Sequence, residues 1–266
     1  MEATQNSIVE DFTEFAMEVI RRAGDEALSY YGKGRSHIKF DDELVTEAEL
    51  YLVDFFQNQM RNAFPEHQLF TNNLQSDAIE NGEKTYLWTF DALDGVANFQ
   101  AGIPMWGMSV SLMENLWPIF GAFYMPSTGD LFYAKAGKKA FLGKEEINIS
   151  DQDSINEESV FLTYSRFTHH FRHTFPGKIR NLGSTAAHIC YVAKGCAEAA
   201  IIANESYQDL AAVQIIIEAA GGKIFKLDGG EFFLSEYMDG KRIEDRLLVV
   251  SPDIYSEVLD YLQPVD

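Results

Sequence analysis

The spacing of apolar residues along the first 65 positions predicts two amphipathic helices. Apolar residues recur every three or four positions after the capping-box spacing of Ser7 and Glu10, which predicts a helix from about Ser7 to Tyr31. A second capping box, Thr46-Glu47-Ala48-Glu49, begins the next helix, and Pro65 ends it. The inner face of this second helix is expected to carry Leu52, Val53, Phe56 and Met60.

Short apolar runs separated by Pro and Gly follow as far as residue 150, and this pattern predicts strands. The aromatic-rich run from Tyr86 to Phe90 is typical of a buried strand. Short strands are also expected at His37–Phe40 and Gln68–Thr71, with a loop from Asp77 to Lys84. Four further alternating segments predict an antiparallel meander, namely Met105–Met113, Trp117–Met125, Asp130–Ala136 and Lys139–Phe141.

Helices and strands alternate after the polar segment Ser150–Ser159, which predicts an α/β arrangement. Strands are expected at Val160–Thr163, Ala199–Ala203, Lys223–Leu227 and Leu247–Val250. Helices are expected at Ser184–Gly195, Asp209–Ala220 and Pro252–Leu262. We therefore expect an α+β half at 1–150 and an α/β half at 151–266, which together form one compact unit.

Composition limits the partners of the chain. Its 266 residues, 46% of them apolar, are enough for a large core, and the net charge of −20 argues against nucleic acid as a partner. No secretory signal and no apolar run of about 20 residues is visible, so we expect a cytoplasmic location without a membrane partner. Cys190 and Cys196 fall in one predicted helix about 9 Å apart along its axis, too far for a disulfide.

Candidate chemistry begins where the buried strand ends. Asp91 and Asp94 follow the strand three residues apart, and Gly95 then leads into a short helical segment. The two carboxylates attract a hard cation such as Mg²⁺, which prefers oxygen ligands. The backbone N–H groups of Gly95 and Val96 favour an anion at the start of that segment. A cation beside an anion site suits a phosphate ester, so we expect a small phosphorylated metabolite as the ligand.

Three segments of the chain resemble the inositol monophosphatase family. Asp91 to Phe99 resembles the first family signature, and Gln208 to Ala212 with Ile215 to Gly222 resembles the second. Between them, Gly183 to Gly195 resembles a third family segment, and the order of the three is that of the family. The chain is therefore identified as a divergent member.

The resemblance implies a fold and an activity. The fold is an α/β (α+β) structure with layers in the order αβαβα, the sugar-phosphatase fold, in which the first half carries a large antiparallel sheet. The activity is that of a phosphomonoesterase that uses one to three Mg²⁺ ions on a small phosphorylated polyol, sugar or nucleotide. The resemblance also suggests a homodimer.

The resemblance also assigns roles to individual residues. The metal ligands would be the carboxylates of Asp91, Asp94 and Asp209, the carbonyl of Leu93 and the side-chain oxygen of Asn72. The phosphate and substrate contacts would come from Gly95, Val96, Ala97, Gly183 and Ser184. Two of these residues have a simpler alternative explanation, because Asp and Ser are common at helix N-termini: Asp209 as an N-cap and Ser184 as an ordinary cap.

Several positions depart from the family pattern, and one of them is Gln208, which stands in place of the aromatic residue before Asp209. Asn72 stands where the family has a glutamate that binds metal and activates water, and Val96 replaces a threonine that holds that water. Glu49 stands in place of the aspartate that partners this threonine, although it also fits the capping box. Ile202 falls on the place of a glutamate that contacts the substrate. With Asp94, the positions Glu49, Asn72 and Val96 form the expected catalytic set. The alternative is a pseudo-phosphatase that serves as a ligand-binding or regulatory protein.

Overall fold

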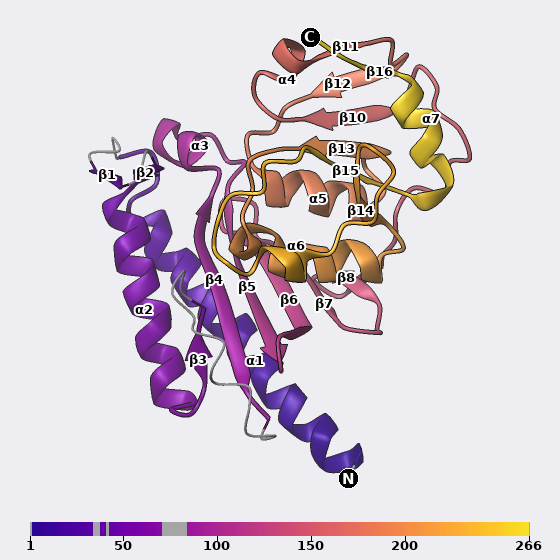
Figure 1. Ribbon diagram of the computed structural model, residues 1–266. Helices are drawn as coiled ribbons and strands as arrows, with labels where there is room; N and C mark the ends of the chain where they lie inside the picture. The colour runs from indigo at the N-terminus through magenta and orange to yellow at the C-terminus, as the bar shows by residue number, and fades with distance from the viewer. Residues whose placement is uncertain (1, 34–37, 41–42, 71–83, 266) are drawn as a thin grey trace.

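Two β-sheets with a pair of helices between them form the centre of the molecule (Figure 1). The structure is a computed structural model that describes residues 2–33, 38–40, 43–70 and 84–265. The prediction of a loop at 77–84 therefore lies almost entirely outside the described residues, as does Asn72. Within the described part of the chain, no helix combines the length and the apolar character needed to cross a lipid bilayer.

The larger sheet has seven strands in the order β3-β4-β5-β6-β7-β8-β9. These are Gln68–Leu69 (β3), Tyr86–Asp94 (β4), Gly107–Glu114 (β5), Trp117–Met125 (β6), Asp130–Lys135 (β7), Ala140–Leu142 (β8) and Glu145–Ile147 (β9). Every pair from β4 to β9 is antiparallel, which confirms the predicted meander, and β3 lies parallel to β4. The strand β9 was not predicted from the sequence.

Helices α1 (Glu2–Leu28) and α2 (Glu47–Ala63) cover the outer face of the larger sheet (Figure 1). The capping box of α2 is confirmed, because Glu49 N–H donates to Thr46 Oγ1 and Thr46 N–H donates to the Glu49 carboxylate. The predicted start of α1 at Ser7 is wrong. Residues 2–6 contain neither Pro nor Gly, so nothing in them interrupts the helix.

A small hairpin precedes α2. It consists of β1 (Ile38–Phe40) and β2 (Glu43–Val45), which pair antiparallel. The strand predicted at His37–Phe40 is therefore present, but its partner is the unpredicted β2.

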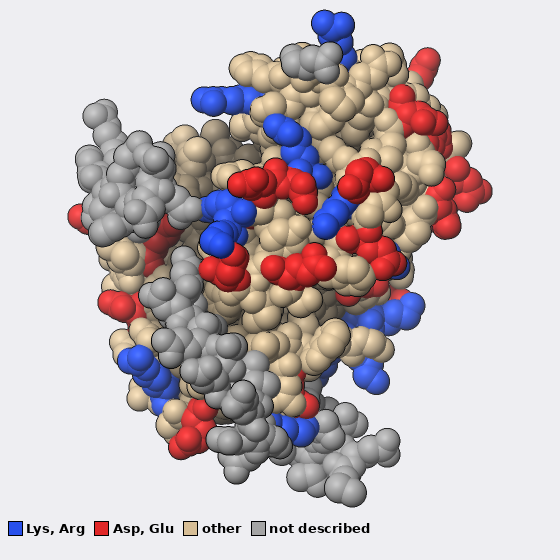
Figure 2. Space-filling model, in the orientation of Figure 1, with Lys and Arg blue, Asp and Glu red and all other residues tan. Residues whose placement is uncertain are grey.

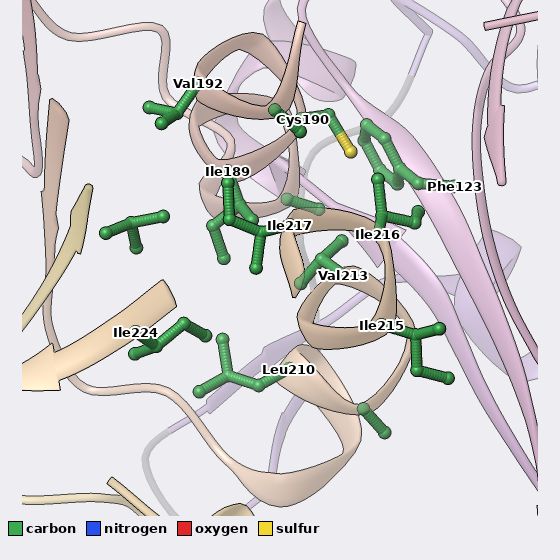
Figure 3. Close-up of a cluster of buried hydrophobic side chains, with 14 of the residues drawn as sticks. Phe123, Ile189, Cys190, Val192, Leu210, Val213, Ile215, Ile216, Ile217 and Ile224 are labelled. Carbon is green, nitrogen blue, oxygen red and sulfur yellow. The ribbon is translucent and has the colours of Figure 1, made fainter. Parts of the chain in front are cut away.

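Helices α5 (Thr185–Ala193) and α6 (Tyr207–Ala219) lie between the two sheets (Figure 1). Both are apolar on nearly all sides, as expected for helices that are buried against a sheet on either face. Their side chains form the centre of the main core, where Phe123 of the larger sheet lies beside Cys190 and Ile216 (Figure 3). Cys190 is a buried free thiol and Cys196 is also unpaired, as the sequence predicted, but Cys196 lies beyond the end of α5 and not in the same helix.

The smaller sheet has five strands in the order β12-β10-β13-β15-β14. They are Val160–Thr163 (β10), Lys178–Arg180 (β12), Ala199–Ile202 (β13), Lys223–Lys226 (β14) and Leu247–Val250 (β15). The strands β12, β10 and β13 are parallel, and β15 is antiparallel to both its neighbours.

A third hydrophobic cluster lies on the outer face of the smaller sheet, and it completes the αβαβα layering that the resemblance implied. The helix predicted at 252–262 is divided into the 3₁₀-helix η3 (Pro252–Ile254) and α7 (Tyr255–Asp260). The other elements were not predicted because they are too short to show a periodic pattern. They are α4 (Phe167–His170), β11 (Phe171–His173), η2 (Leu234–Tyr237) and β16 (Leu262–Pro264), and the short strand β12 was not predicted either.

The distance between α6 and the larger sheet depends on a glycine. A Cβ atom at Gly121 in β6 would lie 2.3 Å from the carbonyl oxygen of Ala212 in α6. This contact involves backbone atoms, which a rotamer change cannot relieve. The helix therefore approaches the sheet as closely as its backbone permits.

We expect Gly121→Ala to destabilise the protein by about 1–3 kcal/mol, because the added methyl group forces α6 away from the sheet. The control is Gly230→Ala, where the new Cβ would meet two movable side chains, Asp228 at 3.0 Å and Lys226 at 3.5 Å. Urea unfolding of both variants gives the two free energies. Equal stability of the two variants would contradict the close approach.

Candidate active site

A cavity of about 980 Å³ lies where the end of β4 meets the first turns of α5 and α6. Most of the sequence-predicted residues line it, namely Glu49, Asp91, Leu93, Asp94, Gly95, Val96, Ala97 and Asp209. Gly183, Ser184 and Ile202 are not among its lining residues. Charge is concentrated here, because six acidic residues (Glu49, Asp54, Asp91, Asp94, Glu205 and Asp209) face one basic residue, Arg242, among the described residues that line the cavity.

Strand β4 delivers the first two carboxylates. The pairing of β4 with β5 shifts register between Asp91 and Asp94, so the strand is irregular where the two acids leave it. The Leu93 N–H donates to Asp91 Oδ1 at 3.2 Å. Gly95 then has a φ of 88°, which favours glycine, and helix α3 (Val96–Ala101) begins directly after it. The segment that resembles the first signature therefore turns at the cavity wall.

The carboxylate of Asp94 caps the N-terminus of α5. The Ser184 hydroxyl donates to Asp94 Oδ2, and the N–H groups of Thr185 and Ala186 donate at 3.2 and 2.8 Å. Burial raises the pKa of Asp94 to about 6, and the hydrogen bonds from Ser184 and Ala186 oppose that rise. Asp94 thus joins the larger sheet to a helix that packs beneath the smaller one.

Ser184 is the N-cap of α5, as the simpler explanation of this residue expected. Its hydroxyl accepts a hydrogen bond from Ala187 N–H at 3.1 Å, and the residue is buried. The preceding turn is tied to α3 by the side-chain amide of Asn98, which donates to the carbonyls of Met105 and Leu182 at 2.6 and 2.7 Å. Gly183 lies in this turn with a φ of 76°.

Asp209 reaches the cavity from the first turn of α6. The N-cap of that helix is Ser206, so the alternative explanation of Asp209 as N-cap is wrong by three residues. Asp209 instead closes a capping box, in which Ser206 N–H donates to its Oδ2 at 2.8 Å. Arg242 Nη1 donates to the same oxygen at 2.6 Å.

The start of α6 is bonded directly to the strand that carries Asp91. The side-chain amide of Gln208, next to Asp209, donates to the carbonyl of Phe90, next to Asp91, at 2.5 Å. The charge of Asp209 raises the pKa of both Asp91 and Asp94, although burial is the larger cause in each case. The three acids are therefore close enough to interact electrostatically.

Glu205 is a cavity residue that the sequence comparison missed. The family pattern points to Ile202, which is fully buried in β13 and belongs to the hydrophobic core. Glu205 lies three residues later in the loop before α6, and its carboxylate accepts a hydrogen bond from Thr185 Oγ1 at 2.8 Å. Burial and then the charges of Asp209 and Asp94 raise its pKa. The available signal was that Glu205 directly precedes Ser206, the N-cap of α6. Counting back from Asp209 by the family spacing leads past Glu205 to Ile202.

Glu49 belongs both to the capping box of α2 and to the cavity. Its charge adds to those of Asp209 and Asp94 in raising the pKa of Asp91, for which burial is the main cause. Val96 is the first residue of α3, and its side chain is half-buried at the cavity. The position therefore offers an apolar side chain where the family pattern has a hydroxyl.

The donor set of the cavity fits a hard divalent cation. Partly buried carboxylates repel one another here, and a cation with oxygen ligands relieves this repulsion. Within the described ranges, however, no three His, Cys, Asp or Glu side chains are already gathered as a metal cage. Oxygens of Asp94 and Asp209 instead accept hydrogen bonds from protein donors.

The chain is similar to known proteins in both sequence and structure. The model of the inositol monophosphatase family matches residues 8–252. The Thermotoga maritima fructose-1,6-bisphosphatase/inositol-1-monophosphatase is 27% identical over 93% of this chain and 98% of its own. Inositol monophosphatase 3 of Solanum lycopersicum is 30% identical over 87% and 91%. A solved structure of the Thermotoga maritima IMPase superposes with a TM-score of 0.78 at 26% identity, covering 94% and 96% of the two chains.

The turn before α5 also depends on a buried histidine. Leu182 N–H donates to His188 Nε2 at 2.9 Å, and burial lowers the pKa of His188 to about 4. In the unfolded chain the imidazole of His188 is protonated as the pH falls through about 6.5, whereas in the folded protein it is protonated only near pH 4. This contribution to stability is complete above pH 6.5 and is lost as the pH falls toward 4.

We expect His188→Gln, which keeps an acceptor for Leu182 but does not titrate, to remove this dependence. Between pH 7 and pH 4 the wild type loses about 3 kcal/mol more unfolding free energy than the variant does. Urea unfolding at several pH values measures both curves, and the carboxylates that titrate contribute equally to each. Parallel curves would show that His188 does not resist protonation.

Proposed function

We propose that this chain, which belongs to the inositol monophosphatase family, is a metal-dependent phosphomonoesterase. One observation carries the proposal: three carboxylates from two distant parts of the chain, Asp91 and Asp94 at the end of β4 and Asp209 in α6, line one cavity and perturb one another electrostatically. Such a concentration of partly buried acids is unfavourable unless a cation joins it. A cation among carboxylates is suited to phosphate esters.

We assign the cation to the carboxylates of Asp91 and Asp209 and to the carbonyl of Leu93. Asp94 lies beside them, and its oxygens face the first turn of α5. A divalent magnesium ion, when bound, supplies Lewis-acid chemistry that polarises a phosphoryl group and lowers the pKa of water. Asp94 holds the first turn of α5 against the end of β4 and so keeps the two walls of the cavity together. The turn at Gly95, Val96 and Ala97 forms the wall that we assign to the phosphate oxygens.

The remaining polar groups divide between water and substrate. Glu49 is the carboxylate that we assign to accepting the proton of the attacking water, and Val96 brings no hydroxyl to hold that water. Thr185 holds the Glu205 carboxylate through its hydroxyl, at 2.8 Å. Glu205 is therefore positioned to accept hydrogen bonds from hydroxyl groups of a ligand in the cavity.

A small phosphorylated polyol, sugar or nucleotide is the substrate class that we propose. The cavity has ample volume for a ligand of this size. The Thermotoga maritima relative carries the names of a sugar bisphosphatase and an inositol monophosphatase, which supports a sugar or polyol phosphate. The relatives described above are named as phosphatases, so nothing in them supports a pseudo-phosphatase.

Nucleic acid does not fit this surface. On the face shown in Figure 2, the Lys and Arg side chains are interspersed with Asp and Glu and form no continuous basic patch among the residues described there. A phosphate backbone would need such a patch, and the net charge of −20 opposes its approach.

We expect Asp91→Asn to lower kcat at least about a hundredfold in a magnesium-dependent phosphatase assay over inositol, sugar and nucleotide phosphates. Loss of a group that only supports a metal ligand already costs about 10–100-fold. Removing divalent cations with EDTA abolishes turnover, and added Mg²⁺ restores it. Asp153→Asn is the matched control, because it removes one exposed carboxylate that does not line the cavity. Full turnover in EDTA would refute the metal-dependent reaction.

We also propose the homodimer that the family resemblance implies. Light scattering coupled to size-exclusion chromatography is expected to give twice the mass of the chain. A mass equal to one chain at micromolar concentration would contradict it.

A further inference from the structure

Arg242 is held at the cavity by its neighbour in the chain. The segment before β15 turns at Gly240, where φ is 75°, and Ile243 then enters the hydrophobic core. The Ile243 N–H donates to the carbonyl of Glu205 at 2.7 Å, which fixes this segment against the loop before α6. Arg242 lies between the turn and this anchor, and its side chain lines the cavity.

The guanidinium group of Arg242 binds the acids of the cavity wall. Its Nη1 donates to Asp209 Oδ2 at 2.6 Å and to the carbonyl of Asn204 at 3.2 Å. It also lowers the pKa of Glu205, against the stronger effects that raise it. The ion pair is partly withdrawn from solvent, with side-chain exposures of 39% for Arg242 and 25% for Asp209.

The guanidinium group of Arg242 occupies the same carboxylate, Asp209, that a metal ion would use. Asp209 Oδ2 already accepts hydrogen bonds from Ser206 N–H and Arg242 Nη1. A carboxylate oxygen with two donors has little capacity left for a metal bond. A divalent cation that binds Asp209 through Oδ2 must therefore compete with the guanidinium group, and one that binds through Oδ1 meets a carboxylate whose negative charge the guanidinium group already neutralises.

We propose that Arg242 is a tethered counter-ion that occupies the Asp209 side of the cavity and weakens the binding of a divalent cation there. This inference rests on the proposed function, since it concerns the same cavity. It makes Arg242 a positioning residue: it sets how firmly Asp209 is held and how much divalent cation is needed to engage it.

Metal binding tests this directly, without turnover. Free Mn²⁺, which takes the same oxygen ligands as Mg²⁺, is counted by electron paramagnetic resonance during titration of the whole protein. Arg242→Gln removes the charge and keeps an amide, and we expect its Kd for Mn²⁺ to be about fivefold lower than that of the wild type. Arg242→Lys keeps the charge and is expected to stay near the wild-type value.

Two controls separate local competition from a change in overall charge. Lys241→Gln removes a positive charge from the neighbouring residue, which is paired with Asp239 and does not line the cavity, and it should leave Kd unchanged. In the Asp209→Asn background, Arg242→Gln should also have no effect, because the competition has been removed.

The outcomes distinguish this inference from the proposed function. Tighter Mn²⁺ binding that is confined to Arg242→Gln and depends on Asp209 supports the tethered counter-ion. Equal Kd values for wild type and Arg242→Gln, with Mn²⁺ bound by both, overturn it and leave the metal-dependent function standing. Absence of Mn²⁺ binding in every variant overturns both.

Discussion

The hydrogen bonds between Asp94 and the first turn of α5 are the interaction on which the cavity depends. They join residues about 90 positions apart, one at the end of the larger sheet and the others on a helix beneath the smaller sheet. Asn98 adds a second link across the same junction through the carbonyls of Met105 and Leu182. The cavity therefore exists only when both sheets and the helices between them have assembled.

This junction gathers negative charge that would be costly if it were left unbalanced. The first turn of α5 stabilises the carboxylate of Asp94 with backbone N–H groups and the partial positive charge of a helix N-terminus. Asp209 is balanced by the guanidinium group of Arg242. Asp91 has the weaker support of one long hydrogen bond from Leu93, so its negative charge is the least well balanced of the three. This unbalanced negative charge makes Asp91 the carboxylate at which a cation would relieve the most repulsion.

The sequence predicted the periodic elements and the signature acids well, and it failed where tertiary contacts decide. The capping box at Thr46–Glu49 is a local signal and was confirmed, whereas the same spacing at Ser7 lies inside a longer helix. Counting from a signature led to Ile202, because loop length before α6 has no periodic pattern; Glu205 occupies the cavity instead. Arg242 comes from an irregular segment, and only its contact with Asp209 reveals its place.

The amide of Gln208 that bonds Phe90 has a consequence for how the cavity can move. It connects the neighbours of Asp91 and Asp209, so the end of β4 and the start of α6 are linked directly and are not expected to move independently. Separating the two would break a partly buried hydrogen bond to a strand carbonyl. We therefore expect ligands of different size to be accommodated by other residues of the cavity wall rather than by separation of Asp91 from Asp209.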